Sequence, residues 1–408
     1  MKPLSFCFVT TFYPPHHFGG DALFVERLAS ALVSDGHQVQ VIYDSDAFFL
    51  AGDEPRATGD PEADRRIQVH DLGRGAVGRT DLFLSHQLGR PVLKRSEIRR
   101  LLRQDDFDVI HFHNISLLGG PAVLREGHGV KLCTLHDYWF VCSMHTLWRY
   151  GREACRARTC IRCTLKGGRP VQWWRYTGSV RRNEEAIDAF ITGSAFSRTA
   201  HMENGFGQDI EVIPHFVPLV RPEGVVASAV TEARPFVLYA GRLEQLKGIE
   251  DLIRFFRSYR ELDLVIAGTG TMDAQLRRDA AGLDHIRFAG WKDGASLREL
   301  YRRSLAVVVP SLCYETFGLS AAEAFANGSP AILRDIGALT ELAAGGGALL
   351  YSTDEELRAH LDTLRLDSQA RAKLAEEARK SYETHFTPRV HLTKYYALIE
   401  RLQESKTA

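Results

Sequence analysis

The sequence carries no excess of charge of either sign. Its 408 residues include 51 Lys and Arg against 51 Asp and Glu, so no overall electrostatic field attracts nucleic acid. It also lacks any run near the ~20 apolar residues that a membrane-spanning helix needs. The first apolar run, residues 4–9, is too short for a signal peptide and suits a buried strand. We therefore expect a cytoplasmic protein that does not bind nucleic acid.

Cysteine is scarce, and a reducing cytoplasm disfavours disulfides. Three cysteines lie singly in apolar contexts and are predicted to be small core residues: Cys7, Cys133 and Cys313. The other four share one stretch, with gaps of 12, 4 and 2 residues: Cys142, Cys155, Cys160 and Cys163. A tetrahedral zinc site tolerates such spacing, but the two shorter gaps also match part of a plant-type ferredoxin pattern. We predict structural zinc, with an iron–sulfur cluster or metal-free thiols as alternatives.

Short apolar runs alternate with helical patterns in two series along the chain. The first series contains LSFCFVTTF, HQVQVIYD, FDVIHFHN and VKLCTLHD, and the second contains RPFVLYAGRL, LDLVIAGTG, IRFAGW and LAVVVPS. Such runs are typical of parallel strands buried on both faces. The predicted fold class is therefore α/β, with two facing, doubly wound, Rossmann-like domains and a deep cleft between them.

The predicted domain boundaries follow from these two series. Residues 1–215 form the N-terminal domain, which includes the cysteine-rich insertion at 142–182. Residues 216–385 form the C-terminal domain. Residues 386–408 have a helical pattern and are expected to pack back on the N-terminal domain.

Two basic residues follow the first strand of the second series. In AGRLEQLKGIEDLI, Arg242 and Lys247 fall between that strand and a predicted helix. A guanidinium and an ammonium beside a helix N-terminus can neutralise a pyrophosphate without a metal ion. Ligands bind at the carboxyl ends of strands in this kind of sheet, so a diphosphate site and an ordinary surface pair are both open interpretations at this point.

A second stretch, PSLCYETFGLSAAEAFANGSPAI, places two carboxylates around a glycine turn. Glu315 lies in the loop, a helix is predicted to begin near Ser320, and Glu323 falls in its first turn. The backbone N–H groups before the helix suit phosphate oxygens or sugar hydroxyls. These come from Phe317, Gly318 and Leu319. Glu323 is suited to accept both hydroxyls of a ribose.

These motifs together resemble the family 4 retaining glycosyltransferases, which have the two-Rossmann GT-B fold. The matching parts are GRLEQLKG and E-x7-E in the second half, with FGG, DVIHFHN and LHD in the first. AGTG and FAGW are similar to loops that hold the nucleotide base. The chain departs from the family's usual Ile-Pro-Asn-Gly at the domain link, where it has Ile-Pro-His-Phe.

The resemblance implies a nucleotide-sugar donor, bound by these residues: Gly19, Gly20, Arg242, Lys247, Gly270, Trp291, Glu315, Phe317, Gly318, Leu319 and Glu323. Arg242 and Lys247 would bind the diphosphate, and Glu323 the ribose. Backbone around Gly270 and Trp291 would hold the base. Gly20 would let its loop approach the phosphates.

The resemblance also implies a catalytic set: His136, Glu315, Arg242 and Lys247. His136 and Glu315 would hold the transferred hexose while the two cations stabilise the leaving diphosphate. We expect front-face displacement with retention and no catalytic metal, with Glu315 as the candidate nucleophile of a covalent alternative. Asp44 and Asp46 resemble the metal-binding Asp-x-Asp of another glycosyltransferase class, but we interpret them as a solvated turn.

The cysteine-rich stretch is also strongly basic. Residues 142–182 contain ten Lys or Arg and one acid, Glu153, with Trp148, Trp173 and Trp174 among them. Such a surface suits an anionic glycan, a polyprenyl-diphosphate-linked acceptor or the inner face of the cell membrane. A solvated basic surface is the alternative.

The resemblance thus implies a hexosyltransferase of cell-surface polysaccharide or glycoconjugate synthesis. A nucleotide-sugar epimerase or hydrolase of related fold is one alternative. A catalytically silent, metal-stabilised binding protein is another, and the intact set of two cations and two carboxylates argues against it.

Overall fold

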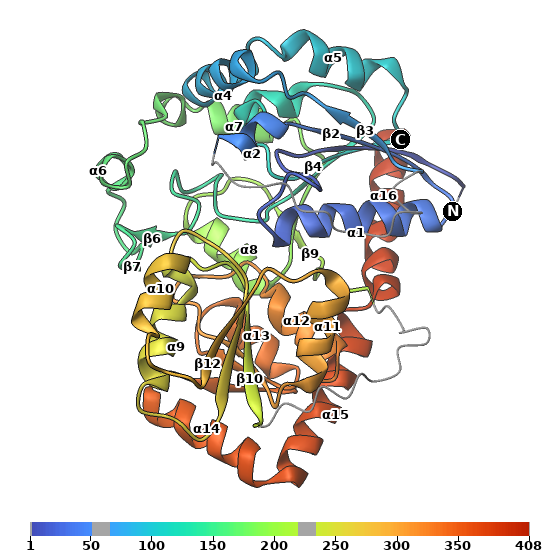
Figure 1. Ribbon diagram of the computed structural model, residues 1–408. Coiled ribbons are helices and arrows are strands. Elements are labelled where there is room, and N and C mark those ends of the chain that lie inside the picture. The colour runs from blue at the N-terminus through green and yellow to red at the C-terminus, as the bar shows by residue number, and fades with distance from the viewer. Residues whose placement is uncertain (1, 51–65, 219–233, 408) are drawn as a thin grey trace. The chain divides into compact units, whose positions relative to one another are not determined.

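The computed structural model describes residues 2–50, 66–218 and 234–407. The chain forms two compact units. Unit 1 comprises Met1–Ile213 and Leu392–Ala408, and unit 2 comprises Pro214–His391. Each unit is built on its own parallel sheet (Figure 1). Among the described residues, no helix is both long enough and apolar enough to cross a membrane.

The sheet of unit 1 has seven strands in the order β3-β2-β1-β4-β5-β8-β9. They are β1 (Ser5–Val9), β2 (Gln38–Tyr43), β3 (Gln68–Asp71), β4 (Val109–Phe112), β5 (Val130–Thr134), β8 (Ala189–Thr192) and β9 (Ile210–Val212). All neighbours pair in parallel. β1 lies between β2 and β4, so the order reverses at β1 and β4.

Helices of unit 1 connect these strands. They are α1 (Gly20–Ser34), α2 (Ser45–Phe49), α4 (Ala76–Leu88), α5 (Arg95–Gln104), η1 (Gly120–Arg125), α7 (Ser179–Glu184) and α8 (Ala195–Glu203). Apolar side chains of α5 and η1 pack on one face of the sheet, and two of the three single cysteines, Cys7 and Cys133, lie in that core. Both are fully buried, as the sequence predicted. The third, Cys313 in unit 2, is also buried.

The cysteine-rich segment follows β5 and has its own small elements. They are the antiparallel pair β6 (Trp148–Arg149) and β7 (Glu153–Ala154), the helix α6 (Cys160–Lys166) and the 3-10 turn η2 (Trp173–Tyr176). α6 and the β6–β7 pair stand at one edge of unit 1, away from its sheet (Figure 1).

The last helix, α16 (Pro388–Thr407), begins in unit 2, and its residues from Leu392 belong to unit 1. Tyr395 is fully buried there; its ring stacks on Phe6 of β1, and its hydroxyl lies 2.9 Å from Nδ1 of His111 in β4. The Tyr396 hydroxyl donates to Asp35 at the end of α1. α16 is therefore an integral part of the core of unit 1.

The sheet of unit 2 has six parallel strands in the order β12-β11-β10-β13-β14-β15. They are β10 (Phe236–Ala240), β11 (Asp263–Ala267), β12 (Ile286–Gly290), β13 (Val307–Val309), β14 (Ala331–Arg334) and β15 (Ala348–Tyr351). Here the order reverses between β10 and β13.

Alternate residues of β10 enter two separate cores, which shows that helices cover both faces of this sheet (Figure 1). Val237 and Tyr239 join one core, and Phe236 and Leu238 join the other, because successive side chains of a strand point to opposite faces. The first core takes in α9 (Ile249–Phe256), α10 (Asp273–Asp279) and α14 (Asp354–Leu366). The second takes in α11 (Gly294–Arg303), α12 (Leu319–Ala326), α13 (Ala338–Ala344) and α15 (Ser368–His385). This arrangement leaves the carboxyl ends of the strands to carry the site.

Candidate active site

The predicted diphosphate residues lie where the strand order of unit 2 reverses. Arg242 follows β10, and Lys247 ends the 3-10 turn η3 (Gln245–Lys247) just before α9. Glu315 lies in the loop between β13 and α12. Ligands of doubly wound sheets bind at such a reversal, because the loops on its two sides diverge and leave space between them. The prediction that these residues lie in loops after strands is therefore confirmed.

Gly248 determines how closely the two loops approach each other. Its φ is 71°, and a Cβ there would lie 1.9 Å from the carbonyl oxygen of Pro310. The amide of Leu312 also donates to the carbonyl of Leu246 at 2.9 Å. Only glycine fits this contact, which brings Lys247 next to Glu315.

The centre of the site is an ion pair. The Lys247 Nζ lies 2.6 Å from Oε1 of Glu315, and the Ser311 hydroxyl donates to the same oxygen at 2.6 Å. Burial acts to raise the pKa of Glu315, but Lys247, Ser311 and Arg242 outweigh it and hold that pKa below its usual value. The two side chains of the pair are 28% and 18% exposed. A charged pair of this kind stays within reach of a ligand.

Glu323 belongs to α12, which begins at Leu319 after Gly318 in the left-handed region at φ 100°. The helix starts at Leu319, next to the predicted position near Ser320, but Glu323 opens the second turn rather than lying in the first as predicted. The buried Tyr301 of α11 donates its hydroxyl to Oε2 of Glu323 at 3.0 Å. This contact orients the carboxylate expected to bind ribose.

The remaining predicted donor residues of unit 2 surround the same strand ends. The Phe317 side chain is buried in the core, so this residue can offer a ligand only its backbone. A Cβ on Gly270 would lie 2.5 Å from the carbonyl oxygen of Leu243, so this glycine lets its loop pack against the loop of Arg242. Trp291 follows β12 and is 37% exposed.

In unit 1 the predicted sugar-binding residue His136 follows β5, near the reversal at β1 and β4. Its Nε2 lies 3.0 Å from Nδ1 of His113, which follows β4, and the two rings stack at 5.3 Å. Burial lowers the pKa of His136, although the nearby Asp21 and Asp137 act to raise it. The imidazole is therefore neutral near pH 7. Both histidines line a small cavity together with Asn114.

The glycine loop of unit 1 precedes this histidine pair. Gly19 adopts φ 132° and caps α1, whereas Gly20 is the first residue of the helix. A Cβ on Gly19 would meet nothing within 4 Å, so the glycine serves backbone conformation rather than close packing. α1 reaches the site through Phe24, whose ring lies 5.6 Å from that of His136.

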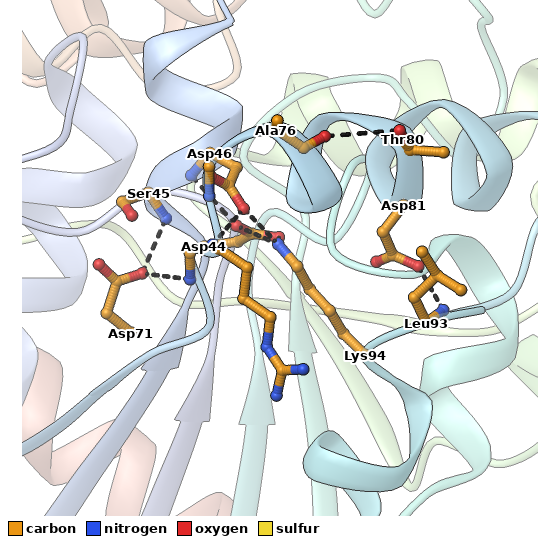
Figure 2. Close-up of polar contacts among 12 residues, drawn as sticks. Asp44, Ser45, Asp46, Asp71, Ala76, Thr80, Asp81, Leu93 and Lys94 are labelled. Atoms are coloured by element: carbon orange, nitrogen blue, oxygen red, sulfur yellow. Dashed lines mark hydrogen bonds and ion pairs between the residues drawn. The ribbon is translucent and has the colours of Figure 1, made fainter.

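The interpretation of Asp44 and Asp46 as a solvated turn was wrong. Both carboxylates are buried, and the buried Lys94 contacts them: its Nζ lies 2.6 Å from Asp44 Oδ2 and 2.8 Å from Asp46 Oδ2 (Figure 2). The amides of Arg74 and Gly75 also donate to Asp46. These aspartates tie α2, α4 and the start of α5 together, and their oxygens are engaged within the protein.

The four clustered cysteines lie near one another in unit 1. Burial raises the pKa of Cys155, and Cys142, Cys160 and Cys163 raise it further. The Tyr150 amide donates to Sγ of Cys163 at 3.3 Å. Over the described ranges, no group of three or more His, Cys, Asp or Glu is placed to hold a metal ion. Zinc at these cysteines stays a prediction.

Three residues of the site were missed by the sequence analysis. Ser311 and Tyr301 hold the two carboxylates, and His113 pairs with His136. His113 directly follows the strand within the pattern DVIHFHN, so its place beside the next strand end could have been inferred from parallel pairing. Nothing in the local sequence distinguishes Ser311 or Tyr301 from other core-facing polar residues.

Comparison with known proteins finds matching family models and relatives. Residues 221–381 match the model of the family "Glycosyl transferases group 1", and residues 18–221 match "Glycosyltransferase Family 4". A glycogen synthase of Mycobacterium tuberculosis is 27% identical over 360 residues, covering 82% of this chain and 78% of that protein. A phosphatidyl-myo-inositol mannosyltransferase of Mycobacterium leprae is 28% identical over 345 residues, covering 80% and 78%.

Solved structures show the same fold at lower identity. Sucrose-phosphate synthase from Thermosynechococcus elongatus has a TM-score of 0.72 at 18% identity, over 98% of this chain and 100% of that one. Anabaena HepE in complex with UDP-glucose has a TM-score of 0.69 at 18% identity, over 97% and 99%. The chain belongs to the group 1, family 4 glycosyltransferases, and its two parallel-sheet α/β domains have the GT-B fold.

Proposed function

We propose that this glycosyltransferase moves a hexosyl unit, with retention of configuration, from a nucleotide-diphosphate sugar to a glycan or lipid-linked acceptor. We propose that this reaction contributes to the synthesis of a cell-surface polysaccharide or glycoconjugate. The observation that carries the proposal is the pair of Lys247 and Glu315, held together at the reversal point of the unit 2 sheet. The pair sits beside the start of α12, so cation, carboxylate and helix dipole converge on one place.

In this mechanism the donor diphosphate takes its positive partners from the protein. Arg242 is exposed and Lys247 is half-buried, so both can reach phosphate oxygens. The backbone amides at the N-terminus of α12 add partial positive charge. As the glycosidic bond breaks, negative charge grows on the leaving phosphate, and these groups stabilise it. We therefore propose that the chemistry proceeds without a catalytic metal ion.

Retention follows if the acceptor hydroxyl attacks from the face that the phosphate leaves, because its oxygen then forms the new bond to the sugar while its proton passes to the departing phosphate oxygen. Glu315 stays ionised, and Lys247 and Ser311 both contact its Oε1, which suits a carboxylate that positions the sugar. This arrangement favours front-face displacement over attack by Glu315 itself.

His136 is proposed to hydrogen-bond the transferred sugar. A neutral imidazole can donate from one nitrogen and accept at the other, and the contact with Nδ1 of His113 uses Nε2 of His136. Only one of these two facing nitrogens carries a proton, so a proton on each of them would break the hydrogen bond. We expect activity to decline as the pH falls far enough to charge this pair.

The nature of the substrates is supported by relatives. The HepE structures contain UDP or UDP-glucose, which supports a nucleotide-sugar donor for this chain. The relative named phosphatidyl-myo-inositol mannosyltransferase supports a lipid-linked acceptor.

The test begins with a thermal-shift screen against nucleotide-diphosphate sugars, because a ligand that binds the folded state raises its stability. The best donor is then incubated with and without acceptor glycans or lipids, and products are followed by NMR. The proposal expects acceptor-dependent transfer with an unchanged anomeric configuration, in the presence of a mild chelator. An inverted product would reject the mechanism. An isomerised or hydrolysed donor without transfer would favour an epimerase or hydrolase, and nucleotide binding without turnover a binding protein.

We also propose that the four clustered cysteines bind one structural zinc ion. Thiolate ligands suit zinc, and the N–H of Tyr150 already points at one sulfur, as is common around such sites. Protein purified without oxygen is expected to contain about one zinc per chain. Cys160→Ser should lower this content, whereas the buried single cysteine variant Cys313→Ser should not. Visible iron–sulfur absorbance would favour the alternative cluster.

A further inference from the structure

We propose that part of the cysteine-rich segment binds the surface of a bilayer containing anionic phospholipid. The docking face, as we name it, consists of exposed side chains on α6, on η2 and on the loop between them: Ile161, Arg162, Leu165, Lys166, Arg169, Trp173 and Tyr176. It concerns where the enzyme works and does not depend on the identity of the donor.

Large apolar side chains are unusually exposed on this face. Leu165 is 60% exposed, Trp173 62% and Tyr176 53%, and Ile161 is 39% exposed. Ile161 and Leu165 are four residues apart on α6, so they lie on the same side of the helix. Single exposed apolar residues are ordinary, but a concentration of them marks an interaction surface. Trp and Tyr in particular favour the boundary between headgroups and acyl chains.

The exposed side chain of Trp173 is presented by a well-anchored backbone. Trp174, next to Trp173, is buried, and its Nε1 donates to the carbonyl of His86 at 2.8 Å. The Arg175 guanidinium lies 5.0 Å from the ring of Trp139 and 4.8 Å from that of Trp174, and it donates to the Trp139 carbonyl. Trp173 is therefore held outward by its neighbours, because the turn that carries it is fixed to the core of unit 1.

The charge of this segment matches an anionic surface. Residues 142–182 carry ten Lys or Arg against one acid, although the whole chain has a formal net charge of zero. That acid, Glu153, already pairs with Arg149. Arg162, Lys166 and Arg169 are exposed on the same stretch of chain, and Lys166 Nζ lies 5.0 Å from the centroid of the Tyr150 ring. Each cation near an anionic bilayer adds to the attraction between the protein and the lipid surface.

The combination of charge and exposed rings favours a bilayer over other anionic partners. A soluble polyanion would use the cations but gain little from Leu165 and Trp173. A lipid surface uses both, since long basic side chains reach the headgroups while apolar ones enter below them. α6 has seven residues and is too short to span a membrane, so the proposed contact is peripheral.

The experiment measures co-sedimentation of the full-length protein with vesicles of phosphatidylglycerol and phosphatidylcholine, and with vesicles of phosphatidylcholine alone. Binding is expected for the anionic vesicles, and it should weaken as salt rises. Leu165→Ser and Trp173→Ser should each weaken binding by roughly fivefold to tenfold, since each removes a large apolar group from the interface. The matched control is Leu366→Ser in unit 2, where Leu366 is 71% exposed, and it should bind like the wild type.

A second measurement tests whether the Trp173 side chain reaches the acyl-chain region of the bilayer. Vesicles with brominated acyl chains should quench tryptophan fluorescence in the wild type, and quenching should be lost in Trp173→Phe. Equal binding to both kinds of vesicle, or binding unaffected by all face variants, would overturn the proposal. Full competition by soluble glycerol phosphate would also overturn it in favour of a simple anion site. Nucleotide-sugar binding is measured in the same samples. Vesicle binding and nucleotide-sugar binding are then scored separately, so the failure of one proposal is not mistaken for the failure of the other.

Discussion

Two lysine–carboxylate centres, one in each unit, use the same chemistry in opposite surroundings. In unit 1, the Lys94 side chain is 2% exposed, and it contacts Asp44 and Asp46, which are 1% and 4% exposed. In unit 2, Lys247 and Glu315 are 28% and 18% exposed at the end of a sheet. The oxygens of the first centre are engaged by lysine and backbone amides. The second keeps a lysine and a carboxylate near solvent, so only the second is suited to meet a substrate.

The largest effect is expected where burial is complete. Lys94→Met keeps the length of the side chain but leaves two buried carboxylates without their cation. Breaking a buried pair in this way costs about 3–5 kcal/mol of unfolding free energy. Denaturation of the full chain by urea measures it. The control is Arg74→Met, which removes the exposed pair with Glu97 and should cost less than ~1 kcal/mol. Equal effects of the two variants would show that the buried centre is not a structural clamp.

The second centre should behave in the reverse manner, with a loss of catalysis and little loss of stability. Lys247→Ala is expected to cost about 2–4 kcal/mol of transition-state stabilisation, as for loss of one preorganised donor, and Arg242→Ala should do the same. Turnover at saturating donor measures it, with the denaturation curve as the check on folding. Lys247→Arg keeps the charge and should retain more activity than Lys247→Ala. Near wild-type turnover in the alanine variants would remove both cations from the mechanism.

The pH dependence of stability separates the centres further. Burial raises the pKa of Asp44 to about 6, although Lys94 acts to lower it. In the unfolded chain the value is near 3.8, so between about pH 4 and pH 6 the folded state binds more protons. As the pH rises from about 4 to about 6, the unfolding free energy of the wild type should therefore fall relative to that of Asp44→Asn. The total decrease should be no more than about 3 kcal/mol. A difference that stays constant from pH 4 to pH 7 would contradict the raised pKa.

The smallest expected effect concerns the hydroxyl that orients Glu323. Tyr301→Phe removes one hydrogen bond worth about 0.5–1.5 kcal/mol, so the Kd for a nucleoside diphosphate should rise roughly twofold to tenfold. Calorimetric titration measures it. Tyr259→Phe is the matched control, because Tyr259 is equally buried in unit 2 and donates to Asp362 instead. An identical change in both variants would indicate a general loss of stability.

The sequence was sufficient for the parts of the fold that depend on local patterns. Apolar runs predicted the parallel strands, and the order of strand and helix placed Arg242, Lys247 and Glu315 at strand ends. It failed where a contact joins distant residues. Lys94 lies about 50 positions from Asp44, and no local pattern links them. A short acidic turn in sequence was therefore interpreted as solvated, when a lysine from another helix start makes it part of the interior.

Residues that orient others were equally hidden. Tyr301 meets Glu323 only because α11 and α12 cover the same face of the sheet. Ser311 is four residues from Glu315, but a serine after a strand has many uses. Family motifs name the groups that touch substrate, and packing decides which neighbours hold them in place.

The course of α16 has a consequence for how the protein is made. Tyr395 completes the interior of unit 1 beside β1 and β4, yet the ribosome adds it after all of unit 2. All strands of unit 2 are synthesised, and can fold, before residues 392–408 of unit 1 leave the ribosome. A nascent chain released early would therefore carry a unit 1 with an uncovered apolar face, the kind of surface that chaperones bind and proteases find. The core of unit 1 can therefore be completed only after synthesis has run past unit 2.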